Sequence, residues 1–166
     1  MSSKVGTESC FSIHPPAVSE EQPVSEVASV NVELEGHGTI LIMDDEEIIR
    51  EIVRNILEFS GYTVESCANG REAVDKYRKA FEEDIRFDAV IMDLTIPGGM
   101  GGKEAAGLIL EIDPEALLIA SSGYSNDPVI AAFKEYGFSG AVAKPFSAAS
   151  LAGEVKRLVV RKQKRN

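Results

Sequence analysis

Polar side chains that can do chemistry stand where the apolar runs of this chain end. They are Asp44, Asp45, Asp93, Ser121, Ser122 and Lys144. If the ends of these runs meet at one place, three carboxylates converge there and repel one another unless a cation lies among them. Oxygen ligands with room for water suit Mg²⁺, and a lysine beside a hydroxyl suits the oxygens of a phosphoryl group. The residue types therefore predict an acidic Mg²⁺ site that handles a phosphoryl group.

The glycine-rich stretch "PGGMGGKE" (97–104) follows Asp93 and suggests a second possibility, a loop that cradles a nucleotide phosphate. The phosphate-binding pattern G-x-x-x-x-G-K-[ST] fails, because Pro97 takes the place of the first glycine and Glu104 that of the Ser or Thr. The dinucleotide pattern G-x-G-x-x-G fails in spacing and in its place along the chain. We therefore expect the glycines to let the backbone turn tightly beside Asp93.

The elements that must position these residues alternate strictly between strand and helix. Apolar β-branched runs predict strands, and stripes of apolar residues between caps predict helices. The predicted strands cover 39–45, 63–68, 87–93, 116–122 and 140–144, and the helices 46–60, 69–82, 103–113, 126–137 and 147–162. This order predicts an α/β fold, a five-stranded parallel sheet with helices on both faces. The carboxyl ends of its strands form the functional crevice, which is where the polar residues stand.

Two features of these helices are specific expectations. The first helix carries one apolar stripe, made of Ile48, Ile49, Ile52, Val53, Ile56 and Leu57. Asn69, Asp127 and Ser147 are expected to cap the second, fourth and fifth helices, with Gly137 ending the fourth.

Composition limits the rest of the chain. The 166 residues carry a net charge of −10, which argues against nucleic-acid binding, since that requires a basic face. Cys10 and Cys67 are too few for a disulfide framework and have no metal-binding spacing. No apolar run is long enough for a membrane span and no signal pattern begins the chain, so we expect a cytoplasmic protein without membrane contact. Residues 1–37 are expected to form an extension or linker, 38–162 one domain, and 163–166 a basic tail.

The motifs together resemble a known family, the receiver domains of two-component response regulators. The paired acids "MDD", the strand "VIMDLTIPGG", the hydroxyl after "LLIA" and the motif "AKPFS" stand in the family's order and approximate spacing. The resemblance covers about 38–162. It implies the flavodoxin-like (βα)5 receiver fold.

The resemblance also implies a role for each polar residue. Asp93 accepts a phosphoryl group from a phosphohistidine, and the domain catalyses its own phosphorylation and dephosphorylation. Mg²⁺ is ligated by Asp45, Asp93 and the backbone carbonyl of Thr95, with Asp44 acting largely through water. Ser121 bonds a phosphoryl oxygen, and Lys144 pairs with the phosphoryl charge across a cis bond to Pro145. The implied partner is a histidine kinase or a histidine phosphotransfer domain, and the implied assembly is a monomer or weak dimer.

One departure from the family concerns how the signal leaves the site. Members often carry Tyr or Phe three residues before the lysine, and this chain has Ala141. The resemblance therefore implies weak signalling through that face, or a role as a phosphate relay.

A second resemblance concerns the N-terminal segment. "VGTESCFSIHPPA" (5–17) is similar to the last strand of a histidine-kinase ATP-binding domain. This implies that the chain is the C-terminal receiver of a hybrid sensor histidine kinase.

Two other functions compete with a phosphoacceptor. An aspartyl-phosphate phosphatase of the haloacid-dehalogenase type also attacks with an aspartate at a strand end, but needs a second acid two residues on, where Thr95 stands. A receiver-like binding module that is never phosphorylated is the other, although every acidic, hydroxyl and lysine position is filled.

Overall fold

The computed structural model describes residues 36–123 and 127–164, and it contains the alternating elements that the sequence predicts. The strands are β1 (Thr39–Met43), β2 (Thr63–Cys67), β3 (Ala89–Asp93), β4 (Leu118–Ser122) and β5 (Gly140–Ala143). The helices are α1 (Glu47–Phe59), α2 (Gly70–Glu82), α3 (Gly102–Ile112), α4 (Pro128–Ala131), the 3₁₀ helix η1 (Phe133–Tyr136) and α5 (Ala148–Gln163).

The five strands form one parallel sheet in the order β2-β1-β3-β4-β5. Because the chain moves outward from β1 in both directions, the crevice between β1 and β3 is the topological switch point of the sheet. In the ladder register Met43 pairs with Met92, and Asp93 pairs with Ser121. The register therefore brings the residues after β1, the end of β3 and the end of β4 to one edge.

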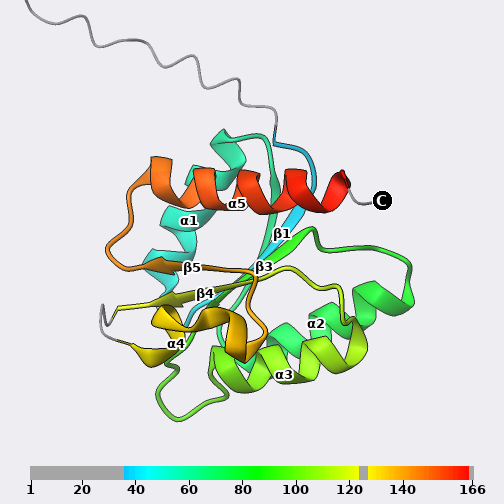
Figure 1. Ribbon diagram of the computed structural model, residues 1–166, viewed down its shortest axis with the longest axis vertical. Helices are drawn as coiled ribbons and strands as arrows, with labels where there is room; N and C mark the ends of the chain where they lie inside the picture. The colour runs from blue at the N-terminus through cyan, green and yellow to red at the C-terminus, as the bar shows by residue number, and fades with distance from the viewer. Residues whose placement is uncertain (1–35, 124–126, 165–166) are drawn as a thin grey trace, which may run out of the picture. The chain divides into compact units, whose positions relative to one another are not determined.

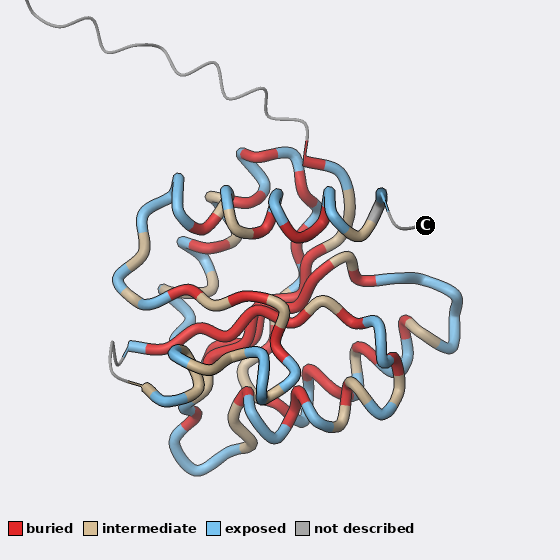
Figure 2. Tube along the Cα trace, in the orientation of Figure 1, coloured by how far each residue is buried: buried red, intermediate tan, exposed pale blue. Residues whose placement is uncertain are grey.

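Each face of the sheet has its own apolar core, because side chains of successive strand residues point to opposite faces. Ile40, Ile42 and Ile91 pack with residues of α1 and α5. Leu41, Val90 and Met92 pack with residues of α2 and α3. Figure 1 shows α1 and α5 above the sheet and α2, α3 and α4 below it, and Figure 2 shows the strands buried between these layers. The predicted α/β fold with helices on both faces is confirmed.

The predicted apolar stripe of α1 is broader than the face that the helix buries. Val53 and Leu57 are buried, and Ile49 and Ile56 pack partly against the same core. Ile48 and Ile52 are 70% and 46% exposed, and Phe59 near the helix end is 76% exposed. A helix resting on one sheet turns a stripe about 100° wide toward the core, whereas the six predicted positions extend over about half of the circumference, so the prediction overestimates the buried face.

The predicted helix over 126–137 is wrong as one continuous helix. α4 spans only Pro128–Ala131, Ala132 leaves the helical region at φ −121° and ψ 36°, and η1 follows. Gly137 ends this segment in the left-handed conformation, as predicted. Helix propensity is a weak preference that tertiary packing overrides, and short 3₁₀ segments are frequent at helix ends.

The three predicted helix caps are confirmed. The side chains of Asn69, Asp127 and Ser147 accept hydrogen bonds from the first turns of α2, α4 and α5. α1 and α3 follow the strands that lead into Asp44 and Asp93, and neither has a side-chain cap. The first turns of α1 and α3, which begin beside the acidic residues, are therefore not stabilised by a capping side chain.

The described part of the chain begins at Gly36 and ends just after α5. Gly36 N donates to Ser60 O at 3.0 Å, and α5 continues through Gln163, one residue beyond the predicted end of the domain. The kinase-like strand predicted over 5–17 and Cys10 lie outside the described residues.

Burial raises the pKa of the Cys67 thiol to about 12, so this cysteine stays protonated. None of the helices in the described ranges is long and apolar enough to cross a membrane.

Candidate functional site

Three carboxylates meet where β1 and β3 end, as the sequence predicts. Asp44 and Asp93 are 3% and 7% exposed, whereas Asp45 is exposed. One carboxylate oxygen of each acid lies within 4.8 Å of the others. Three hard oxygen donors at this spacing can share one divalent cation.

Lys144, from the end of β5, reaches across the sheet edge to the two buried acids. Its Nζ lies 2.6 Å from Asp44 Oδ2 and 2.6 Å from Asp93 Oδ2. A single ammonium therefore offsets two buried carboxylates, which leaves net negative charge in the site. The Lys144–Pro145 peptide bond is cis, as the resemblance implies.

The other carboxylate oxygen of each buried acid accepts a hydrogen bond from a backbone amide. Asp44 Oδ1 accepts a hydrogen bond from the amide of Glu46 at 3.0 Å. Asp93 Oδ1 accepts one from the amide of Thr95, also at 3.0 Å. Such turns with the amide two residues on fix the carboxylate orientation locally, so the strand ends present both acids toward Lys144.

Burial is the largest influence on the pKa values of Asp44 and Lys144. Burial raises the pKa of the Asp44 carboxyl above its ordinary value, and the opposing contacts with Lys144 do not fully cancel this. Burial lowers the pKa of the Lys144 ammonium, but hydrogen bonds to Asp44 and Asp93 outweigh it, so the pKa is raised overall. Lys144 therefore remains charged, and an ionised Asp44 is costly without a further cation.

The two adjacent serines of β4 have different surroundings. Ser122 is fully buried, and its Oγ donates to Asp127 Oδ2 at 3.1 Å, which links the end of β4 to the cap of α4. Ser121 is also buried, yet its Oγ has no hydrogen-bond partner among the described residues. Buried hydroxyls are rarely left unpaired, so Ser121 retains a hydrogen-bonding capacity that Ser122 uses on Asp127.

The glycine loop packs directly against the backbone around Asp93. A Cβ atom on Gly102 would lie 2.6 Å from the carbonyl oxygen of Asp93, and one on Gly101 would lie 2.5 Å from that of Leu94. The amide of Gly70 also donates to Met100 O at 2.9 Å, which ties the loop to the start of α2. The predicted role of the glycines, a tight turn beside Asp93, is supported by these approaches.

Arg50 of α1 contacts the site, and the sequence analysis did not identify it. Its Nη1 atom donates to the backbone oxygens of Asp44 at 2.7 Å and Asp45 at 3.0 Å. A signal was present, because Arg50 is the first cation after the paired acids and lies within two helical turns of them.

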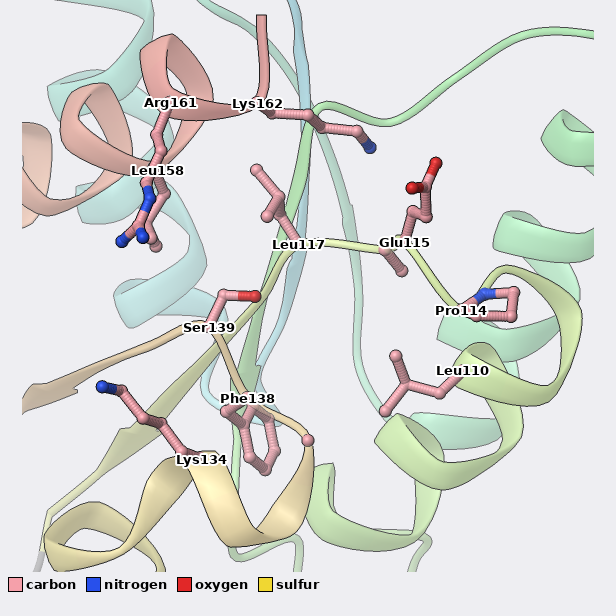
Figure 3. A pocket seen from close by; sticks show the side chains of 12 residues that line it. Leu110, Pro114, Glu115, Leu117, Lys134, Phe138, Ser139, Leu158, Arg161 and Lys162 are labelled. Atoms are coloured by element: carbon pink, nitrogen blue, oxygen red, sulfur yellow. The ribbon is translucent and has the colours of Figure 1, made fainter. Parts of the chain in front are cut away.

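A cavity of about 420 Å³ lies away from this site, between the end of α3, the start of β4 and the last turns of α5. Three cations line it, Lys134, Arg161 and Lys162, together with Glu115 and an apolar floor. Figure 3 shows Lys134 and Lys162 extending toward opposite sides of the cavity. The charges therefore do not converge on one point, and none of the acidic-site residues lines the cavity.

Comparisons with known proteins agree with this geometry. Residues 40–156 match the model of the response regulator receiver domain. The chain is 35% identical to the chemotaxis protein CheY of Thermotoga maritima over 108 residues, which is 64% of this chain and 85% of that protein. It is 29% identical to the sensor kinase CckA of Brucella abortus over 95% of this chain and 17% of the kinase.

A solved receiver structure is similar to this chain in both fold and sequence. The response regulator TrrA of Thermotoga maritima, determined in complex with Mg²⁺ and beryllofluoride, superposes with a TM-score of 0.62. It is 31% identical, and the match covers 73% of this chain and 98% of that one. Family model, relatives, sheet order and the acidic edge thus agree, and the chain belongs to the response regulator receiver family of two-component signalling systems.

Proposed function

We propose that Asp93 is the phosphoacceptor of this receiver and takes its phosphoryl group from a phosphohistidine. A carboxylate oxygen of Asp93 attacks phosphorus, the oxygen–phosphorus bond forms and the phosphorus–nitrogen bond breaks. The electron pair stays on the imidazole nitrogen, which takes a proton from solvent. Later attack by water on phosphorus breaks the bond to the Asp93 oxygen, releases inorganic phosphate and returns the free carboxylate.

The remaining residues of the site act on the transferred group. Lys144, which contacts Asp93 at 2.6 Å, pairs with the negative oxygens of the phosphoryl group. Ser121 donates its hydroxyl hydrogen to another of these oxygens. Both groups stabilise charge that Asp93 alone could not hold in water.

The donor set fits Mg²⁺. Asp45 and Asp93 would ligate the ion directly, the carbonyl of Thr95 would be a third protein ligand, and Asp44 would act through water. A bound Mg²⁺ would neutralise the entering phosphoryl group and the carboxylates around it. The net negative charge that remains after Lys144 is counted favours such a cation.

One observation carries this proposal: the buried hydroxyl of Ser121, which has no hydrogen-bond partner within 36–123 and 127–164 and lies directly across the β3–β4 ladder from Asp93. An unpaired buried hydroxyl costs about 1–3 kcal/mol. A phosphoryl oxygen on Asp93 supplies the missing acceptor. The haloacid-dehalogenase alternative lacks this support, and Thr95 stands where its second acid is needed.

Beryllofluoride, which mimics a phosphoryl group on an aspartate, tests the proposal. We expect saturable, Mg²⁺-dependent changes in the backbone NMR spectrum of the wild-type protein. Ser121→Ala should weaken this response, and Ser122→Ala should retain it, because Ser122 is already bonded to Asp127. Absence of any Mg²⁺-dependent response in the wild type would favour the binding-module alternative.

Receiver domains interact with histidine kinases and phosphotransfer proteins, and we infer that this partner docks along α1. Ile48 and Ile52 are exposed one helical turn apart and begin three residues after Asp45. An apolar stripe that leads to the acidic edge suits a helical partner that brings its histidine to Asp93.

Charge substitutions on this stripe test the docking. Ile48→Glu should slow transfer from a phosphorylated histidine phosphotransfer domain without slowing labelling by acetyl phosphate. Ile85→Glu is the control, since Ile85 is similarly exposed but lies between α2 and β3. Equal transfer to both variants would contradict docking on α1.

We also propose that the chain is the C-terminal receiver of a hybrid sensor histidine kinase, with 5–17 as the last strand of the kinase ATP-binding domain and 17–37 as the link to the receiver. The match to CckA supports this, because it extends over 95% of the chain and so beyond the receiver itself.

A further inference from the structure

The three acids of the site are not held equally. Asp44 and Asp93 each accept two hydrogen bonds through their own carboxylate oxygens. The carboxylate of Asp45 is exposed and accepts none from any donor in residues 36–123 and 127–164. The structure therefore constrains this side chain only through the backbone that places its Cβ atom.

Arg50 holds that backbone from both sides. One guanidinium nitrogen carries two hydrogens, and Nη1 donates to the carbonyl oxygens of Asp44 and Asp45. These two carbonyls belong to the peptide units immediately before and after the Cα atom of Asp45. Because each unit is planar, fixing both limits φ and ψ of Asp45 and thus the direction of its Cα–Cβ bond, from which the carboxylate extends.

One other hydrogen bond spans this turn, from the amide of Glu46 to Asp44 Oδ1 at 3.0 Å. Glu46 caps α1 without a side-chain hydrogen bond, and the first helical bond, from Arg50 N to Glu46 O, is 3.1 Å long. The same residue thus closes the first turn of α1 through its backbone and the preceding turn through its side chain.

We propose that Arg50 is the positioning residue for Asp45, which it preorganises as a Mg²⁺ ligand by clamping the two flanking peptide units. This inference rests on the proposed Mg²⁺ site and adds to it the determinant of its exposed ligand. A ligand that is fixed before the ion arrives loses less conformational freedom on binding.

The direction in which one substitution changes the Mg²⁺ affinity distinguishes this role from a purely electrostatic one. Arg50→Met keeps the aliphatic stem and removes the donors and the charge. Loss of a nearby positive charge alone would strengthen Mg²⁺ binding. Loss of positioning should instead weaken it, by about 10-fold or more, as is typical of residues that orient metal ligands.

Arg54→Met is the matched control. Arg54 lies one turn further along α1 and donates to Ser66 Oγ at 2.7 Å, away from the acids. We would measure Mg²⁺ affinity by NMR titration of the full chain and the free energy of unfolding in urea for wild type, Arg50→Met, Arg50→Lys and Arg54→Met. We expect the weakest Mg²⁺ binding in Arg50→Met, intermediate binding in Arg50→Lys, which keeps a donor that can reach one carbonyl, and wild-type binding in Arg54→Met. Unchanged or tighter binding in Arg50→Met would overturn the inference, and if that variant does not fold, wild-type affinity in Arg50→Lys would overturn it.

A measurement without metal keeps this test separate from the proposed function. The ¹⁵N heteronuclear NOE of the Asp45 and Glu46 amides should fall in Arg50→Met and stay at the wild-type value in Arg54→Met. If the wild type bound no Mg²⁺, the proposed function would fail, whereas an unchanged NOE in Arg50→Met would contradict the clamp itself.

Discussion

Asp93 and Asp113 are two buried aspartates with nearly the same local structure and different surroundings. They are 7% and 8% exposed, and Oδ1 of each accepts a hydrogen bond at 3.0 Å from the amide two residues on. Asp93 ends β3, at the carboxyl edge of the sheet, and Asp113 follows α3, at the opposite edge. Their second oxygens meet different groups.

The surroundings of Asp113 are balanced. Its Oδ2 accepts a hydrogen bond from Tyr77 Oη at 2.8 Å, and Arg86 Nη1 lies 3.8 Å away. The ring of Tyr77 packs on Phe87, with centroids 5.9 Å apart. These contacts tie α2 to the connection between α3 and β4, so Asp113 is a structural acid.

The surroundings of Asp93 are unbalanced. Three carboxylates gather here, one ammonium contacts two of them, and a buried hydroxyl nearby has no partner in the described part of the chain. The comparison shows that burial and a local turn do not make an aspartate functional. Uncompensated charge and an unpaired donor around it do, because both are relieved by a ligand.

The largest expected difference between the two acids is in phosphorylation. Asp93→Asn should abolish the gain of one phosphoryl mass on incubation with acetyl phosphate and Mg²⁺, because an amide cannot form the acyl phosphate. Asp113→Asn should retain that gain and lose about 1–3 kcal/mol of stability through its damaged hydrogen bonds. Intact-mass spectrometry and urea unfolding measure the two effects. Wild-type labelling of Asp93→Asn would place the phosphoacceptor elsewhere.

Removal of the shared cation should be the next largest effect. Lys144→Met leaves Asp44 and Asp93 buried without a counter-charge, which we expect to cost about 3–5 kcal/mol of unfolding free energy. Saturating Mg²⁺ should recover much of this loss, since the ion replaces the missing positive charge. Urea unfolding with and without Mg²⁺ measures both.

Lys76→Met is the control for that substitution. Lys76 pairs with Glu65 at 3.0 Å on an exposed surface, so its loss should cost less than about 1 kcal/mol. A Mg²⁺ rescue of Lys76→Met as large as that of Lys144→Met would contradict the assigned role of Lys144.

The sequence predicts the fold and the membership of the site because both depend on local patterns. β-branched runs predicted the strands, and Asp44, Asp45, Asp93, the pair Ser121 and Ser122, and Lys144 stand where the runs end. In a parallel sheet the run ends must share one edge, so the residues could be brought together without coordinates.

What the sequence could not provide depends on distances between elements. The choice between Ser121 and Ser122 depends on the contact of Ser122 with Asp127, and the burial of the α1 isoleucines depends on how the helix rolls on the sheet. The break at Ala132 and the reach of Arg50 to two carbonyls likewise depend on packing. The periodicity of apolar residues along the sequence contains no information on these contacts between elements.

A smaller effect is expected at the structural acid. Tyr77→Phe removes the donor to Asp113 and leaves its buried Oδ2 without that bond, which should cost about 1–3 kcal/mol of unfolding free energy. Mg²⁺ affinity should not change, because Tyr77 and Asp113 lie at the other edge of the sheet. Tyr136→Phe is the control, since Phe can keep the ring contact with Lys103, and its cost should stay within about 0.5 kcal/mol. A loss of Mg²⁺ affinity in Tyr77→Phe would break the contrast between the two edges.

The smallest effect concerns the pH dependence of the metal-free site. Burial raises the pKa of Asp44, so its contribution to stability is fully present below the ordinary carboxyl pKa and is lost as pH rises through the folded-state pKa. At neutral pH the metal-free protein therefore carries a costly ionised Asp44, and Asp44→Asn should be more stable than wild type in urea. On acidification wild-type Asp44 binds a proton and the difference should close. Asp45→Asn, at the exposed acid, should show little change at either pH. An advantage of Asp44→Asn that grew as pH fell would mean that Lys144 outweighs burial at this carboxyl, and that the site without metal is already balanced in charge.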